Sequence, residues 1–156
     1  MTKKHELHIG RIHADWCGHC VRLKGEWEKM RNHISHAMGR VFNHVSIQYH
    51  DFEDSEEQKK RGHHVDKELA KFNELHLPHS SQKAELKGGY PTLFRVLNGN
   101  LEYYEGERHL ESMYNWFTNG LAKKGGKKRK RKTRAKGKKT KRRKLTRKTN
   151  LFRFFY

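Results

Sequence analysis

The chain has 156 residues, with 36 Lys and Arg against 17 Asp and Glu and a formal net charge of +19. All the acidic residues and 17 of the basic ones precede residue 122, so residues 1–121 are formally neutral and the excess charge belongs to the tail. Two cysteines are too few for a disulfide-stapled secreted scaffold, and the start has no apolar stretch like that of a signal peptide. We therefore expect an intracellular protein with one folded domain over residues 1–121, no signal peptide and no transmembrane segment.

The first predicted strand covers residues 7–14 and leads into the segment Asp15 to Cys20. A long helix is predicted to follow, ending near Gly39. Its apolar residues recur at steps of three and four, at Leu23, Trp27, Met30, Ile34 and Met38. The two cysteines therefore lie where this helix begins.

Alternating apolar residues over 45–49 predict a second strand. Residues 51–64 are polar and are interpreted as a loop or an irregular insertion, whose His63 and His64 we take as solvated surface rather than metal ligands. A shorter apolar stripe over 65–75 predicts a second helix.

Two β-like runs, 93–97 and 101–104, flank Asn98-Gly99-Asn100, which predicts a hairpin because Asn-Gly tolerates the positive φ angles of a tight turn. Apolar residues over 110–121 then predict a closing helix. The predicted order is β-α-β-α-β-β-α, an α/β fold with a mixed central sheet flanked by helices.

Two cysteines separated by two residues at a helix start suit thiol–disulfide exchange. The helix N-terminus stabilises the Cys17 thiolate, and Cys20 is close enough to resolve a mixed disulfide. The same spacing is also half of a zinc site, for which His13 and His19 are the nearest further ligands. A pair of purely structural thiols is the third interpretation, and the spacing leaves all three open.

A resemblance favours the first interpretation. Trp16-Cys17-Gly18-His19-Cys20 resembles the active-site signature of protein disulfide isomerase domains, in the thioredoxin superfamily. Gly89 to Leu93 resembles the cis-proline loop of that family and the strand after it, and Tyr104 to Arg108 resembles its last strand. The match covers roughly residues 7–121, and it implies a minimal thioredoxin-like fold.

The resemblance implies roles for the residues of the cysteine motif. Cys17 corresponds to the exposed nucleophile and Cys20 to the buried thiol that releases the product. His19 corresponds to a residue that favours the Cys17 thiolate and shifts the pair toward oxidising, isomerase-like chemistry. Trp16 and Gly18 complete the motif around the two thiols.

The cis-proline loop is implied to bind substrate. By the same resemblance, Pro91 follows a cis peptide bond and the backbone of Tyr90 pairs with an extended substrate chain. Without the resemblance, Pro91 would be interpreted as an ordinary turn proline at the start of a strand.

Two positions depart from the family's pattern. The buried carboxylate that takes the proton from the resolving thiol is expected six residues before Cys17, where this chain has Arg11, which cannot act as a base. His13 or a water molecule would then have to take over, unless the strand register is shifted or exchange is slow. The family's helix-kinking proline is replaced by Gly25, which weakens a helix without imposing a bend.

The segment 122–149 is a separate, low-complexity tail in which 18 of 28 residues are Lys or Arg. Such a segment is predicted to be disordered by itself and to bind nucleic acid or another polyanion through counterion release, and it also has the composition of a nuclear localisation signal. The cations that we single out for polyanion binding are Lys127, Lys128, Arg129, Lys130, Arg131, Lys132, Arg142 and Arg143.

The last segment, 150–156, is rich in aromatic side chains and is predicted to dock into a groove of a protein partner. Its apolar and aromatic residues are Leu151, Phe152, Phe154, Phe155 and Tyr156. A neutral fold with a Lys-Arg-Thr tail resembles, in composition alone, small proteins packaged by large double-stranded DNA viruses. The expected locations are therefore the cytoplasm, the nucleus or a virus particle.

Together these features predict an enzyme, a thiol–disulfide oxidoreductase that exchanges or isomerises disulfides in protein substrates. Its redox group is the cysteine pair itself, with no further cofactor and no metal. The alternative is a non-catalytic thioredoxin-fold assembly protein, such as a virion component, which acts through its basic tail and whose thiols are incidental. Arg11 is the feature that favours this alternative.

Overall fold

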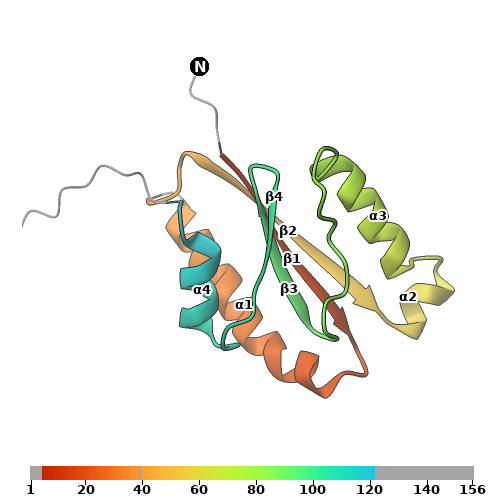
Figure 1. Ribbon diagram of the computed structural model, residues 1–156. Helices are drawn as coiled ribbons and strands as arrows, with labels where there is room; N and C mark the ends of the chain where they lie inside the picture. The colour runs from red at the N-terminus through yellow and green to blue at the C-terminus, as the bar shows by residue number, and fades with distance from the viewer. Residues whose placement is uncertain (1–4, 39, 122–156) are drawn as a thin grey trace, which may run out of the picture. The chain divides into compact units, whose positions relative to one another are not determined.

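The structure is a computed structural model that describes residues 5–38 and 40–121 (Figure 1). Its elements are β1 (His5–Ala14), α1 (Gly18–Met38), β2 (Val45–Asp54), α2 (Glu56–Lys60), α3 (Val65–His76), β3 (Thr92–Leu97), β4 (Asn100–Tyr103) and α4 (Leu110–Thr118). The predicted basic tail, 122–149, and the aromatic segment, 150–156, lie outside the described residues. Among the described residues, no helix is long and apolar enough to cross a membrane.

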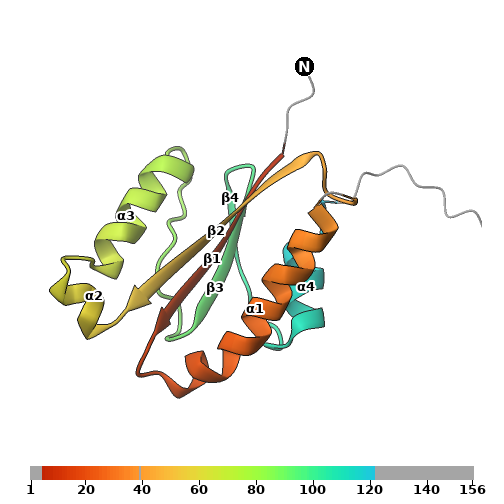
Figure 2. The same ribbon diagram turned by 180° about the vertical axis from the view of Figure 1, so that it is seen from behind.

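The sheet has four strands in the order β2-β1-β3-β4. β1 pairs with β2 in parallel and with β3 antiparallel, and β3 pairs with β4 antiparallel. Helices α1 and α4 lie on one face of this sheet and α3 on the other, as both views show (Figures 1 and 2). The predicted mixed-sheet, thioredoxin-like α/β fold is confirmed.

Alternating side chains of β1 feed two hydrophobic cores, because neighbouring strand residues point to opposite faces. The core under α1 and α4 comprises Leu7, Ile9, Leu23, Trp27, Met30, Ile34, Phe42, Val45, Leu93, Met113, Phe117 and Leu121. The core under α3 comprises Ile12, Phe52, Leu69, Phe72, Leu77, Ala84, Phe94, Val96 and Leu101. The sheet is therefore covered on both faces.

The segment predicted as a polar loop differs from the expectation. β2 continues to Asp54, and the short helix α2 follows it. The Ser55 hydroxyl accepts a hydrogen bond from the Gln58 N–H at 3.2 Å, which is the N-cap arrangement that allows a helix to begin. Within the α3 stripe, Leu75 is exposed rather than buried.

The predicted hairpin is confirmed at 98–100. Asn98 and Gly99 have φ angles of 52° and 84°, in the left-handed region that a two-residue turn requires. The turn joins β3 to β4 and so fixes their register, with Leu97 opposite Asn100.

Arg95 of β3 attaches α4 to the sheet, a contact that sequence reasoning did not anticipate. Only 6% of Arg95 is exposed, and its Nη1 donates to the carbonyl oxygens of Trp116 and Asn119 at 2.6 and 2.9 Å. These carbonyls lie at the C-terminal end of α4, where a cation is favoured by the helix dipole. Glu102 balances the charge at 2.6 Å.

A Gly→Ala substitution is expected to have opposite effects on stability at Gly25 and at Gly10. An added Cβ at Gly25, inside α1, meets nothing within 4 Å, so Gly25→Ala should stabilise the domain by about 0.5–1 kcal/mol through helix propensity. At Gly10 the Cβ would lie 2.1 Å from the Phe94 ring, so Gly10→Ala should destabilise by about 1–3 kcal/mol or more. Urea unfolding of the two variants measures both, and equal midpoints would contradict the two packing assignments.

Candidate active site

The two cysteines lie at the N-terminus of α1, just beyond the end of β1. Cys17 and Cys20 are 8% and 5% exposed and are free thiols, so Cys17 is nearly as buried as Cys20 and is not exposed as the resemblance implied. The Cys17 N–H donates to the carbonyl of Ala14, the last residue of β1, at 3.3 Å, and its own carbonyl accepts from Val21 at 3.0 Å. The central strand therefore delivers the first thiol directly to the helix start.

The loop before β3 supplies the opposite wall of the site. The peptide bond between Tyr90 and Pro91 is cis, as the resemblance implied. The Cys17 thiol lies 3.6 Å from the Tyr90 carbonyl oxygen, to which it donates, although the two residues are 73 positions apart. Thr92 holds the loop in place, because its hydroxyl donates to the carbonyls of Lys87 and Gly89 at 3.0 and 2.8 Å.

The two thiols differ in acidity. A hydrogen bond from the Cys20 side chain lowers the pKa of Cys17, and the backbone N–H groups of Cys20 and His19 and the Arg108 guanidinium act in the same direction. Burial raises the pKa of Cys20. Of the two thiols, Cys17 is therefore the one that ionises more readily, and the thiolate is the nucleophilic form of a cysteine.

The strand order, the dithiol at the start of the helix after β1 and the facing cis proline together decide the architecture. The chain carries a thioredoxin-like domain. In its Cys-x-x-Cys motif the position nearer the helix N-terminus bears the more acidic thiol.

No protein-family model and no curated protein matches the sequence of this thioredoxin-like domain. Similar solved structures include the zinc-bound form of human ERp44, at 17% identity and a TM-score of 0.47, over 74% of this chain and 27% of that one. The first two thioredoxin domains of Naumovozyma dairenensis Eps1p match at 16% identity and a TM-score of 0.45, over 76% of this chain and 36% of that one. The first thioredoxin domain of mouse protein disulfide-isomerase A4 matches at 20% identity and a TM-score of 0.46, over 80% of this chain and 69% of that one. The chain spans less than half the length of the ERp44 and Eps1p chains.

Tyr90 is positioned by side chains as well as by its loop. Its hydroxyl donates to the Asp54 carboxylate at 2.8 Å, and Lys59 of α2 holds the same carboxylate at 2.9 Å. Burial, followed by this hydrogen bond, raises the pKa of Tyr90 to about 12, so the phenol stays protonated. Trp16, which is 67% exposed, meets the Tyr90 ring edge-on at 5.5 Å. The segment that we had interpreted as a polar insertion therefore supports the cis-proline loop.

His19, between the two cysteines, is exposed, and among the described residues its ring makes no hydrogen bond to Cys17. Its Nδ1 accepts from Arg22 at 2.9 Å, because a guanidinium can only donate. The contribution of His19 to the lowered pKa of Cys17 comes from its backbone N–H. Gly18, the first residue of α1, has open space around it, since an added Cβ would meet nothing within 4 Å.

Arg11 stands where the resemblance implied a buried carboxylate, and the structure pairs it with the carboxylate of Asp51. Its Nε donates to Asp51 of β2 at 2.7 Å, and its guanidinium lies 5.2 Å from the centre of the Trp27 ring. Arg31 of α1 binds the second oxygen of Asp51 at 3.2 Å. Asp51 is therefore neutralised by two guanidinium groups.

Behind Cys20 is a pocket of about 470 Å³ that also holds titratable side chains. Its lining includes Cys20, His13, Glu53 and the Arg11–Asp51 pair. Burial, and then the Arg11 charge, lower the pKa of His13, so that its imidazole is neutral at neutral pH and has a free site for a proton. The sequence indicated His13 as an alternative base, but Asp51 and Glu53 were missed because the second strand was predicted to end at residue 49.

The structure brings together the predicted residues Arg11, Trp16, Cys17, Gly18, His19, Cys20, Tyr90 and Pro91 at one end of the sheet. Arg108 joins them, because its Nη2 donates to the Pro91 carbonyl at 3.2 Å. The predicted polyanion-binding and partner-binding residues, from Lys127 onward, lie outside the described residues.

Proposed function

We propose that the domain is a thiol–disulfide oxidoreductase that acts on disulfides of protein substrates. The observation that carries this proposal is the Cys17 thiol at the start of α1, 3.6 Å from the carbonyl of the residue before the cis proline. The lowered pKa of Cys17 and the raised pKa of Cys20 support a division of labour between an attacking and a resolving thiol.

The reaction proceeds in two exchange steps. The Cys17 thiolate attacks one sulfur of a substrate disulfide, forms a mixed disulfide and releases the other substrate sulfur as a thiolate. Cys20 then loses its proton and attacks the Cys17 sulfur, which releases the second substrate thiolate and leaves a Cys17–Cys20 disulfide. The substrate gains two electrons and the pair loses two, and the reverse sequence oxidises a substrate dithiol.

Substrate is held beside the thiols by a backbone and an exposed aromatic side chain. The Tyr90 backbone lies next to Cys17, and its position is fixed through Thr92 and Asp54. Trp16 offers an apolar surface at the same edge. An extended polypeptide that passes Tyr90 would place a disulfide against Cys17, the arrangement that the family resemblance implies.

Trapping distinguishes the two thiols. In the full chain, Cys20→Ser should leave a long-lived mixed disulfide between Cys17 and a disulfide-containing model protein, because resolution is lost, whereas Cys17→Ser should form none. In the wild type, alkylation by iodoacetamide should remain fast below the ordinary thiol pKa of about 8.5, since the depressed pKa keeps Cys17 ionised there. Mass spectrometry of the adducts and the pH–rate profile measure both.

If neither variant traps substrate and both thiols alkylate like an unperturbed cysteine, the oxidoreductase proposal fails. The thioredoxin-like domain would then be a non-catalytic scaffold, and the protein would act through its basic tail. This is the alternative that Arg11 favours.

His13 is the group that we propose accepts the Cys20 proton, directly or through a water molecule. Because Arg11 cannot take that proton, His13→Gln should slow the resolution of the mixed disulfide by up to roughly 100-fold while Cys17 alkylation stays unchanged. Rapid quenching of the mixed disulfide measures the step, and His36→Gln, at the exposed end of α1, is the matched control. Equal resolution rates in wild type and His13→Gln would assign the proton to solvent.

For the basic tail we propose binding to nucleic acid or a similar polyanion, supported by its 18 cations in residues 122–149. Replacing the six cations of residues 127–132 by Gln in the full chain should flatten the salt dependence of duplex DNA binding, by up to about 5 in the slope of log K against log salt. Fluorescence anisotropy over a salt series measures the slope. Lys67→Gln with Lys71→Gln, on α3, is the control, and an unchanged slope in the tail variant would exclude this role for residues 127–132.

A further inference from the structure

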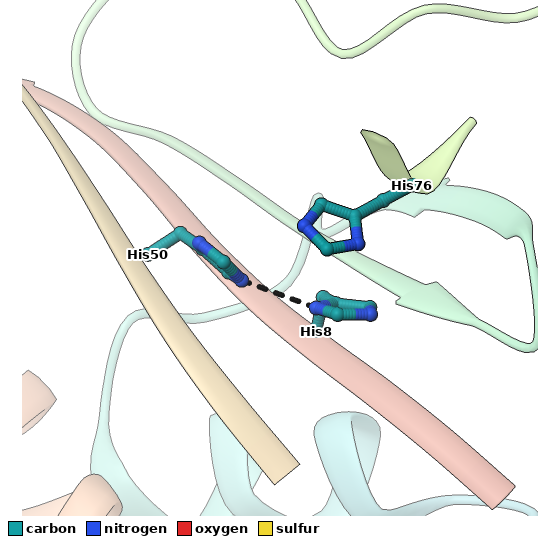
Figure 3. Close-up of side chains that lie close together, drawn as sticks. All are labelled: His8, His50 and His76. Carbon is teal, nitrogen blue, oxygen red and sulfur yellow. Dashed lines mark hydrogen bonds between the residues drawn. The ribbon is translucent and has the colours of Figure 1, made fainter. Parts of the chain in front are cut away.

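Three histidines gather on the α3 face of the sheet, away from the cysteine pair. His8 comes from β1, His50 from β2 and His76 from the last turn of α3, and their rings face one another (Figure 3). Each offers one ring nitrogen to a group whose members all lie within 4.8 Å of one another. Among the described residues, this is the only such group of three metal-ligating side chains.

The spacing of these nitrogens is close to that of a metal site. His8 Nδ1 and His50 Nε2 are 3.1 Å apart. Two nitrogens that bind one zinc ion tetrahedrally, at about 2.0–2.1 Å each, lie roughly 3.3 Å from each other. The centre of the His76 ring lies 4.0 Å from that of His8, with the two ring planes tilted by 40°. Because His76 is at the end of α3, a small rotation of its side chain would complete the set of three ligands.

The surroundings favour a ligand over a simple polar contact. His8 is 4% exposed, and the aromatic ring of Phe72 packs against all three imidazoles at 4.8 to 6.1 Å. Within the described residues, the only side-chain hydrogen bond of the three rings joins His8 to His50. Three imidazoles with a single side-chain hydrogen bond between them thus stand together beside an apolar core.

The histidine group is close to a hollow in the surface. His76 lines a surface pocket of about 520 Å³ beside the β3–β4 turn, which connects the group to solvent.

We propose that His8, His50 and His76 bind a divalent transition metal ion of the zinc class. Three imidazoles are suited to zinc, copper, nickel or cobalt, whereas magnesium and calcium require oxygen ligands. Three protein ligands leave a fourth position for water. The ion would tie the C-terminal end of α3 to β1 and β2, and its site is separate from the Cys17–Cys20 pair.

Zinc binding to the full chain tests the proposal. Wild type should bind one zinc ion per chain in isothermal titration with ZnCl2, and His76→Gln should weaken this affinity by at least roughly tenfold, since even second-shell changes cost 10–100-fold. His76 is half-buried at a helix end, so this variant should fold. His63→Gln with His64→Gln, an exposed pair outside the group, should bind as wild type does.

The cysteines need their own control, because thiolates also bind zinc. Cys17→Ser with Cys20→Ser should retain the zinc site in full. A zinc ion that is lost with the cysteines, or with His63 and His64, would overturn the assignment, as would affinity that His76→Gln and His50→Gln both leave unchanged.

X-ray absorption of the zinc-loaded wild type gives an answer that needs no variant. The expected spectrum has nitrogen and oxygen neighbours only, with the outer-shell pattern of about three imidazole rings. Sulfur neighbours would place the metal at the Cys pair, and a chain that binds no zinc at micromolar concentration would show that the three histidines are only a group of packed polar side chains. Either result refutes the site.

Discussion

The double pairing of β1 is the constraint on which the rest of the structure depends. β2 lies on one side of this strand and β3 on the other, and helices cover both faces. Beyond the exposed His5 and Glu6, the side chains of β1 therefore enter one of two cores or need a polar partner there. Leu7 and Ile9 pack into the core under α1, and Ile12 packs into the core under α3. Two of the polar side chains of β1 are paired with side chains of β2, His8 with His50 and Arg11 with Asp51. Each of these pairs belongs to one of the two proposed sites.

On the α1 face this constraint shapes the candidate active site. Arg11 is half-buried beneath α1, with 12% of its side chain exposed, and Asp51, its register partner on β2, neutralises its charge. The same register places Glu53 opposite His13, behind Cys20. The position where the resemblance implied a carboxylate is thus occupied by an ion pair, and the His13 imidazole, for which we propose the role of base, lines the same pocket.

Local sequence signals predicted the elements that depend on neighbouring residues. The Cys motif at a helix start, the Asn98-Gly99 turn and the apolar stripe of α1 were all correct, because caps, positive φ angles and helical spacing are properties of short segments. The sequence could not give the register between β1 and β2, which depends on packing of both faces at once. That register alone brings Arg11 to Asp51, and it sets His8 two residues from the position opposite His50. The extension of β2 into polar residues was missed for the same reason. Asp and Glu are depleted in strands, and the partners that hold Asp51 and Asp54 come from other elements.

β2 is the element that the two proposed sites share. His50, Phe52 and Asp54 lie on its α3-facing side at successive alternate positions. His50 belongs to the histidine group. Asp54 accepts a hydrogen bond from the hydroxyl of Tyr90, and the backbone carbonyl of Tyr90 faces Cys17. A metal that fixed His50 against α3 would therefore restrain the strand that positions the cis-proline loop, only four residues further along. β2 and the hydrogen bond from Tyr90 to Asp54 are therefore the structural link between the two proposed sites.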